Sequence, residues 1–322
     1  MFAELALIAV ATEAIIGYPD AVFRLIGHPV TWIGRLITWC DEAWNSPTAL
    51  APTRRWRGLL TLLLLIAASV AAGVATTAIV DRLLPSLAAL MVCGVLASSL
   101  LAQRSLDTHV LAVATALEQG GLAAGRQAVS QIVGRDTKSL DEAAVCRAAI
   151  ESLAENFSDG VVAPLLWMVI GGLPGALAYK AINTADSMIG HKSERYLAFG
   201  WASARCDDLV NLPASRLSAL WLALAAALLG LSPRAALATV WRDAGRHRSP
   251  NAGWPEAAMA GALTIRLSGP RLYQGRPVQE PWVGEGTGDL TAQHIRAALK
   301  LYRVACGLQI AVLGALMISL GR

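Results

Sequence analysis

Three long apolar segments constrain the fold of this chain more than any other feature. Residues 58–80, 86–103 and 304–321 contain no charged side chain, and each approaches the roughly 20 residues that cross a bilayer as a helix. A shorter apolar segment, 2–17, is a further but marginal candidate. Backbone polar groups inside a bilayer must be hydrogen-bonded within the segment, so these segments predict helices. We therefore expect an all-α integral membrane protein with about four spanning helices plus re-entrant and interfacial helices.

The composition supports this class and excludes others. Only 16% of the 322 residues are charged and the mean hydropathy is +0.50, whereas soluble domains carry about 25% charged residues. The net charge of +4 is modest and the basic residues are scattered, so we expect no nucleic-acid partner. The five cysteines lie far apart without a CxxC or Cys/His pair. They predict neither a disulfide framework nor a zinc site.

The apolar segment 161–179 leaves two interpretations open. Its centre reads G-G-L-P-G, which divides it into two halves, each about half a bilayer long at 1.5 Å per residue. This pattern predicts a re-entrant helical hairpin, but a single kinked spanning helix is also possible because membrane helices tolerate Gly and Pro. Residues 29–46 resemble an amphipathic interfacial helix, residues 105–156 a more polar helical region, and 217–231 an apolar helix before Ser232-Pro233.

The distribution of Lys and Arg favours the re-entrant interpretation. If neither 161–179 nor 217–231 spans, all the basic loops fall on one side, as the positive-inside bias prefers. We therefore expect one integral membrane domain, 1–322, in the cell (inner or plasma) membrane, with its site facing the cytoplasm. The loops that would form this site are 18–57, 104–160, 180–216 and 232–303.

Two polar clusters flank the segment 161–179. Glu151, Glu155 and Asp159 recur every four residues, so on a helix they form one slowly drifting stripe. Asn183 and Ser187 repeat the spacing on the far side, with Asp186 beside them. Placing polar and ionisable side chains next to a segment that can enter the bilayer costs free energy. Their presence on both sides of 161–179 therefore suggests a functional site rather than two solvated helix ends.

Two further clusters contain residue types that suit a metal–nucleotide site. The segment 205–216 places Arg205 and Asp208 one turn apart, beside Asp207, and this spacing also suits a structural ion pair. The segment 248–263 contains Asn251 in a turn and Glu256 in the expected first turn of a helix. The exposed amides of such a turn could hold an anion, and a capped helix without a ligand is the alternative. Carboxylates suit Mg²⁺, and Lys or Arg suits phosphate. The chain has no P-loop, G-x-G-x-x-G, H-E-x-x-H or G-x-S-x-G motif.

Together these clusters resemble the CobD/CbiB family, the membrane adenosylcobinamide-phosphate synthases of cobalamin biosynthesis. The resemblance covers nearly the whole chain. The segments that carry it are His28-Pro29-Val30 with Ile33-Gly34, E-S-L-A-E-N-F-S-D-G at 151–160, Y-K-A-I-N-T-A-D-S-M-I-G at 179–190, the 205–216 segment, S-P-N-A-G-W-P-E-A-A-M-A-G-A-L at 249–263 and G-E-G at 284–286.

The resemblance implies an ATP-dependent amide ligase. Its substrates would be adenosylcobyric acid, which is a corrinoid, and aminopropanol or aminopropanol phosphate, with ATP as co-substrate, Mg²⁺ as cofactor and the lipid bilayer as surroundings. Other corrinoid-pathway membrane enzymes are candidate partners. The implied catalytic residues are Glu151, Glu155, Asp159 and Asp186. The implied metal ligands are Asp159, Asp186, Asp207 and Asp208. The implied substrate- or nucleotide-binding residues are Asn156, Lys180, Asn183, Ser187, Lys192, Arg195, Arg205, Asn251 and Glu256.

Two alternatives come from other functional classes. Re-entrant hairpins with buried polar residues also build transport pathways, although no inverted repeat is visible here. A non-catalytic membrane regulator, such as the AmpE-like proteins, is the other alternative. It would leave so many carboxylates near the membrane unexplained.

Overall fold

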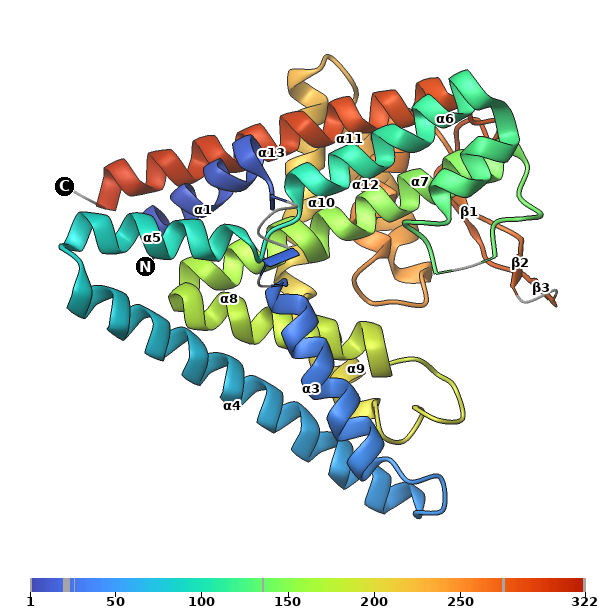
Figure 1. Ribbon diagram of the computed structural model, residues 1–322. Helices are drawn as coiled ribbons and strands as arrows, with labels where there is room; N and C mark the ends of the chain where they lie inside the picture. The colour runs from blue at the N-terminus through green and yellow to red at the C-terminus, as the bar shows by residue number, and fades with distance from the viewer. Residues whose placement is uncertain (1, 20–23, 26, 135, 274–275, 321–322) are drawn as a thin grey trace. The chain divides into compact units, whose positions relative to one another are not determined.

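The computed structural model describes residues 2–19, 24–25, 27–134, 136–273 and 276–320. The protein is predominantly helical, as the apolar segments predict (Figure 1). Its contacts divide it into two compact units whose segments alternate along the sequence. The first unit comprises Met1–Ala102, Ala163–Asn211 and Leu313–Arg322, and the second comprises Gln103–Val162 and Leu212–Val312. The expectation of one domain stays a prediction.

The first unit is built around one long helix and one helical hairpin. Buried apolar side chains from three helices and the loop before α9 meet in a common core, which includes Ile37, Leu65, Ala185 and Phe199. Large apolar side chains on other faces of α4 and α5 are exposed, as suits contact with lipid. The helices of this unit are α1 (Ala3–Ile16), α3 (Pro29–Trp44), α4 (Ala51–Leu83), α5 (Ser86–Ser98), α8 (Ala163–Ile189) and α9 (Trp201–Val210).

Helix α8 turns back on itself at Gly172, which has φ 62° and ψ −153°. A Cβ atom on Gly175 would lie 2.5 Å from the carbonyl oxygen of Trp167, although eight residues of straight helix would separate them by about 12 Å. Both arms reach the end of α9, because the Trp167 indole donates to the Val210 carbonyl at 3.1 Å and the Tyr179 hydroxyl donates to Asn211 at 2.9 Å. Figure 1 shows the two arms of α8 side by side. The geometry therefore favours the re-entrant hairpin over a single kinked helix.

Four helical stretches are long and apolar enough to cross a bilayer: Ala51–Leu83, Ser86–Val129, Glu142–Ile189 and Ala292–Ser319. They contain the predicted segments 58–80, 86–103 and 304–321. The third stretch qualifies by length and composition, but it includes the turn at Gly172. The pair α9 and α10, bent by 43°, is a further candidate for a broken span or a re-entrant loop.

The marginal candidate segment 2–17 forms a helix that is shorter than a bilayer span. Helix α1 has 14 residues, about 21 Å of helix against about 30 Å of hydrocarbon. It ends at Gly17, whose φ of 68° other residues rarely adopt. A glycine also lets α5 approach closely, because a Cβ atom on Gly94 would lie 2.4 Å from the Ile8 side chain. Helix α1 therefore packs as a short helix against α5 and α8.

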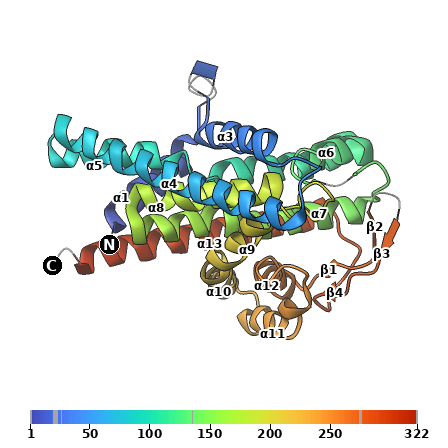
Figure 2. The ribbon, with the colours of Figure 1, turned by 90° about the horizontal axis from the view of Figure 1, so that it is seen from below.

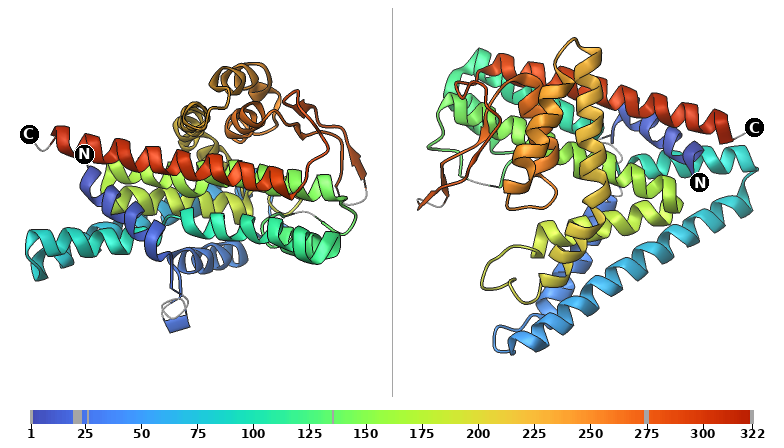
Figure 3. Two further views of the ribbon diagram at one scale, coloured as in Figure 1. Left: turned by 90° about the horizontal axis from the view of Figure 1, so that it is seen from above. Right: turned by 180° about the vertical axis from the view of Figure 1, so that it is seen from behind.

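In the second unit, three helices pack together and support the polar residues described below. Figure 3 shows α10, α11 and α12 side by side. Gly261 of α12 lies against the carbonyl oxygen of Ala235, where a Cβ atom would come within 2.5 Å. The helices of this unit are α6 (Gln103–Val129), α7 (Glu142–Phe157), α10 (Leu212–Leu228), α11 (Pro233–Asp243), α12 (Gly253–Leu263) and, through both units, α13 (Ala292–Leu320). Short turns follow two of them, the π-helical turn η1 (Ser158–Val162) and the 3₁₀ turn η2 (Ala244–Arg246).

Short strands were not expected from the sequence. Antiparallel pairs join β1 (Leu267–Ser268) to β4 (Trp282–Val283) and β2 (Arg271–Tyr273) to β3 (Arg276–Val278). With two or three residues each, these strands are too short to show the alternating pattern that predicts a strand. Their importance lies in one pairing, Ser268 opposite Trp282.

Candidate functional site

The predicted site residues of the first unit gather where the second arm of α8 meets α9. The Asn183 amide donates a hydrogen bond of 3.3 Å to the carboxylate of Asp207, which is 8% exposed. Asn211 lies beside this carboxylate and accepts a hydrogen bond from the Tyr179 hydroxyl. The Asn183 amide provides a partner that a buried carboxylate needs. Asn183 of the 179–190 segment therefore contacts a buried carboxylate of α9.

Negative charge is concentrated around Asp207. Asp186 lies close enough to Asp207 and Asp208 for their charges to repel one another. Burial, and next the charge of Asp186, raises the pKa of Asp207 to about 7, while the amides of Asn183 and Asn211 act in the opposite direction. A carboxyl group with a pKa near 7 can gain or lose a proton at working pH, as a general base must.

The neighbouring groups complete this first network. Arg205 pairs with Asp208 at 3.1 Å, the structural ion pair that their spacing also allowed, and the predicted roles of the two residues in nucleotide and metal binding stay predictions. Gly190 is required beside Asp186, because a Cβ atom there would lie 2.0 Å from the Asp186 carboxylate. His28 caps α3 by accepting from the Val30 amide, and its surroundings, first through burial and then through the charge of Lys180, lower its pKa.

The residues predicted as metal ligands do not form a preformed metal cage. Within the described part of the chain, no three His, Cys, Asp or Glu side chains are placed to hold one ion together. Mg²⁺ differs from most metals because one or two carboxylates plus substrate phosphates and water suffice. The close carboxylates of Asp186, Asp207 and Asp208 suit that mode.

The second unit holds its own buried network around Ser268. The Ser268 backbone N–H donates to the Glu151 carboxylate at 2.8 Å, and its hydroxyl donates to Glu256 at 3.4 Å. His247 approaches the same Glu256 carboxylate at 3.7 Å. Ser268 has a φ of 57°, a region rarely used outside glycine. The network therefore joins two sequence-predicted residues through a serine and a histidine that the sequence analysis missed.

A turn beside this network holds Asn251. The Asn251 side-chain oxygen accepts hydrogen bonds from the Ser215 hydroxyl at 3.1 Å and the Arg216 guanidinium at 3.0 Å. Arg216 also stacks on the Trp254 ring, 4.3 Å from its centroid. The end of the 205–216 segment and the start of the 249–263 segment thus meet. The side-chain oxygen of Asn251 therefore accepts hydrogen bonds from other residues of the second unit.

The G-E-G segment also has a defined contact. The Gly284 N–H donates to the buried Asp243 carboxylate at 2.9 Å, and Gly284 has φ +89°. First through the hydrogen bond from Arg242, the surroundings lower the pKa of Asp243. Glu285 pairs with the same arginine. This contact fixes the segment that precedes α13.

The remaining predicted residues lie on α7, η1, α8 and the loop after α8. Glu155 and Asn156 are exposed, and the Asn156 amide donates to the Ser152 carbonyl. Asp159 lies in η1 and is partly exposed. Such π-helical turns occur frequently at functional sites. Ser187, exposed on α8, donates to the Asn183 carbonyl, and Lys192 is exposed in the loop that follows α8.

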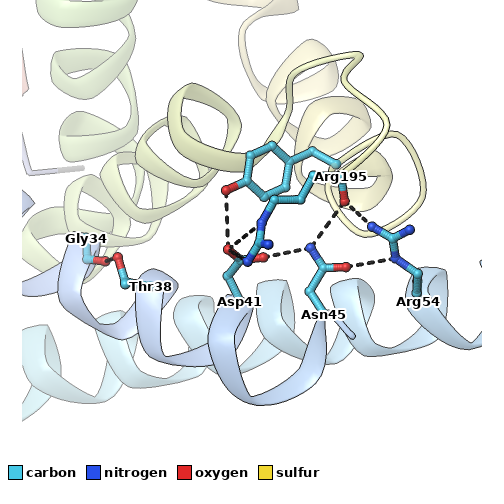
Figure 4. A network of polar contacts seen from close by, with 7 residues as sticks. Gly34, Thr38, Asp41, Asn45, Arg54 and Arg195 are labelled. Atoms are coloured by element: carbon cyan, nitrogen blue, oxygen red, sulfur yellow. Dashed lines mark hydrogen bonds and ion pairs between the residues drawn. The ribbon is translucent and has the colours of Figure 1, made fainter. Parts of the chain in front are cut away.

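Arg195 belongs to a network that attaches the 190–200 loop to α3 and α4 (Figure 4). Its guanidinium pairs with Asp41 at 2.7 Å, and the Tyr196 hydroxyl donates to the same carboxylate. Asn45 donates to Asp41 and to the Arg195 carbonyl, and Arg54 donates to Asn45. In the first unit, viewed from below, α3 and α4 lie next to each other (Figure 2). The observed contacts of Arg195 are therefore structural, and its predicted role in phosphate binding stays a prediction.

Comparison with known proteins identifies the family of this all-α membrane protein. Residues 6–302 match the family described as CobD/Cbib protein. The chain is 49% identical over 313 residues to the cobalamin biosynthesis protein CobD of Rhodobacter capsulatus, covering 97% of this chain and 96% of the relative. It is 52% identical over 304 residues to the CobD of Sinorhizobium fredii, covering 93% and 92%, and 46% identical over 298 residues to that of Brucella suis, covering 92% and 90%. No solved structure matches. The chain therefore belongs to the CobD/CbiB family.

Proposed function

We propose that this protein acts in cobalamin biosynthesis as an ATP-dependent ligase. It would join the free propionate carboxyl of adenosylcobyric acid to (R)-1-aminopropan-2-ol or its O-phosphate, giving adenosylcobinamide or its phosphate. Membership of the CobD/CbiB family and the names of its relatives support the pathway. The observation that best supports the chemistry is Asp207, a buried carboxylate with a pKa near 7 beside a second carboxylate, Asp186.

The reaction needs activation because a carboxylate oxygen is a poor leaving group. Transfer of the ATP γ-phosphoryl group to the carboxylate would give an acyl phosphate and ADP. The amine nitrogen would then attack the carbonyl carbon, forming the C–N bond while the C–O bond to phosphate breaks. The proton lost by the amine requires a base, for which Asp207 and Asp186 are the candidates in the first unit.

The other residues would bind and orient. Exposed basic side chains, among them Lys192 and Arg205, could neutralise phosphate charge. Mg²⁺, held by one or two of the carboxylates Asp186, Asp207 and Asp208, would offset charge on the nucleotide phosphates. Because ATP is cytoplasmic, the proposal places the protein in the cell membrane with its site facing the cytoplasm.

Purified protein in detergent tests the proposal directly. With adenosylcobyric acid, aminopropanol phosphate and Mg-ATP, mass spectrometry should detect the amide, and ADP should accumulate in equal amount. Omission of ATP and the Asp207→Asn variant serve as controls. Absence of amide with either amine, under conditions in which the Rhodobacter capsulatus relative forms it, would refute the ligase. Corrinoid uptake into proteoliposomes without ATP turnover would instead favour a transporter.

A further inference from the structure

Two arginines lie near one tryptophan in the second unit. The guanidinium carbons of Arg147 and Arg266 lie 5.4 Å and 5.2 Å from the centroid of the Trp282 ring. Among the described residues, neither arginine forms an ion pair, whereas Arg296 and Arg303 of the same unit each pair with a carboxylate. Two positive charges held at one aromatic ring without a counter-ion among the described residues would be stabilised by an anion from outside the chain.

Local structure explains why the two arginines meet. Arg147 lies one turn before Glu151 on α7, and residues four apart share a helix face. Arg266 lies two residues before Ser268 in the sequence. The hydrogen bond from Ser268 to Glu151 joins these two elements. Trp282, paired with Ser268 across the strands, completes the cluster.

The tryptophan is fixed in place by a glycine. A Cβ atom on Gly269 would lie 2.6 Å from the Trp282 ring, and Gly269 has φ +82°, which other residues rarely adopt. The ring can therefore lie directly against the backbone. Cation–π contacts with this ring orient both guanidinium groups.

Most of the donor N–H groups in this cluster remain available. Arg147 donates one hydrogen bond of 2.9 Å to the Gly288 carbonyl. The Nε atom of Arg266 is buried, yet it has no hydrogen-bond partner within the described part of the chain. A buried donor without a partner is rare in native proteins and calls for an explanation. A bound anion would supply the missing acceptor.

We propose that Arg147 and Arg266 bind the phosphate group of a phosphorylated co-substrate of the ligase. This inference rests on the proposed function. Paired guanidinium forks match phosphate oxygens. The phosphate of the phosphorylated amine is one source of this group. The same chemistry would also bind ATP phosphates, and the experiment separates the two sources.

The kinetic test compares Arg147→Gln and Arg266→Gln with the wild-type protein, using phosphorylated and free aminopropanol. Loss of one charge-assisted contact should raise the KM for the phosphorylated amine about ten- to a hundredfold, while the KM for the free amine stays within about twofold. Arg296→Gln, which removes an arginine that already has a carboxylate partner, is the matched control. A raised KM for ATP, with both amines unchanged, would support the anion site and assign it to the nucleotide. A uniform loss of kcat with no change in any KM would overturn the inference.

A binding test separates this inference from the ligase proposal. Inorganic phosphate should raise the thermal midpoint of the wild-type protein in detergent, and this shift should be lost in Arg147→Gln and Arg266→Gln. Arg266→Lys keeps the positive charge but lacks the planar guanidinium group, so it should retain part of the phosphate-induced shift in thermal midpoint. If phosphate raises the thermal midpoint of the wild type but not of the glutamine variants, and no amide forms, the result supports the anion site and refutes the ligase proposal. If phosphate shifts the wild type and both glutamine variants equally, the site is refuted.

Discussion

Gly73 of α4 lies directly against Pro174 at the turn of α8: a Cβ atom on Gly73 would come within 2.7 Å of the Pro174 Cα atom. Small residues allow this approach between helix backbones in a membrane. A second contact fixes the same turn, because the N–H of Phe2 donates to the Val169 carbonyl at 2.9 Å. The turn of the hairpin is therefore held by two other segments of the first unit.

The first prediction tests this contact. Gly73→Ala should destabilise the protein by about 1–3 kcal/mol, the usual cost of overpacking, because its neighbour is backbone that cannot move aside easily. The matched control is Gly307→Ala on α13, where a Cβ atom meets nothing within 4 Å. Thermal midpoints in detergent should fall for the first variant and stay level or rise for the second. Equal midpoints for the two variants would contradict the close contact.

The second prediction concerns topology. Because α8 turns back at Gly172, its two ends lie on one side of the turn, and single cysteines near Asp159 and near Asp186 should be labelled from the same side of the membrane. Cytoplasmic labelling is expected from the charge of the loops. The five native cysteines, one of them only partly buried, must be replaced first. Labelling from opposite sides would show that the segment spans.

The third prediction concerns catalysis. Asp159→Asn and Asp186→Asn keep the side-chain size and remove the charge, so each should lower turnover by at least about a hundredfold, the scale for one electrostatic catalytic group. The variants should still fold. Amide formation is measured alongside the thermal midpoint. Near-normal turnover in both would mean that these carboxylates only terminate helical segments.

The fourth prediction follows from the raised pKa of Asp207. The folded protein holds this proton more tightly than the unfolded chain, so its unfolding free energy should fall as pH rises from about 4 to about 7. Between pH 5 and pH 8, the loss should be about 2.5 kcal/mol, and Asp207→Asn should abolish it. Denaturant unfolding in detergent at both pH values measures the difference. If Asp207→Asn showed the same fall in unfolding free energy, the pH dependence would come from other groups.

The fifth prediction separates the structural role of Arg195 from a role in substrate binding. Asp41→Asn and Arg195→Gln should each lower the unfolding free energy by about 1 kcal/mol, as for a partly exposed pair, and their effects should be non-additive. A raised KM for ATP in Arg195→Gln alone would support nucleotide binding. If Asp41→Asn raised that KM equally, the effect would come through the loop instead.

Much of the helical framework was predictable from local patterns. Residues 105–156 form helices as expected, with a kink of α6 at Gly121. Ser232-Pro233 begins α11, with the serine hydroxyl accepting from the Ala235 amide. Gly172 supplies the positive φ of the hairpin. These features depend on residues close together in the sequence, which is why the sequence revealed them.

The candidate site was only partly predictable. The polar segments pointed to Asp207 and Glu256, but no pattern marked Ser268, which contacts Glu256 at a separation of 12 residues and Glu151 at a separation of 117 residues. It also could not show that Arg195 is paired with Asp41. Such partners depend on tertiary packing, and a single serine or aspartate on its own carries no positional signal.

The network of Figure 4 has a consequence for how this chain could be divided. Residues 191–194 are exposed, while Arg195 immediately after them is tied to Asp41 and Asn45. A protease that cleaves after Lys192 would therefore leave two fragments that stay connected through the contacts of Arg195 with Asp41 and Asn45. When co-expressed as separate polypeptides, fragments 1–192 and 193–322 should associate. The first unit would then stay assembled without the peptide bond between residues 192 and 193.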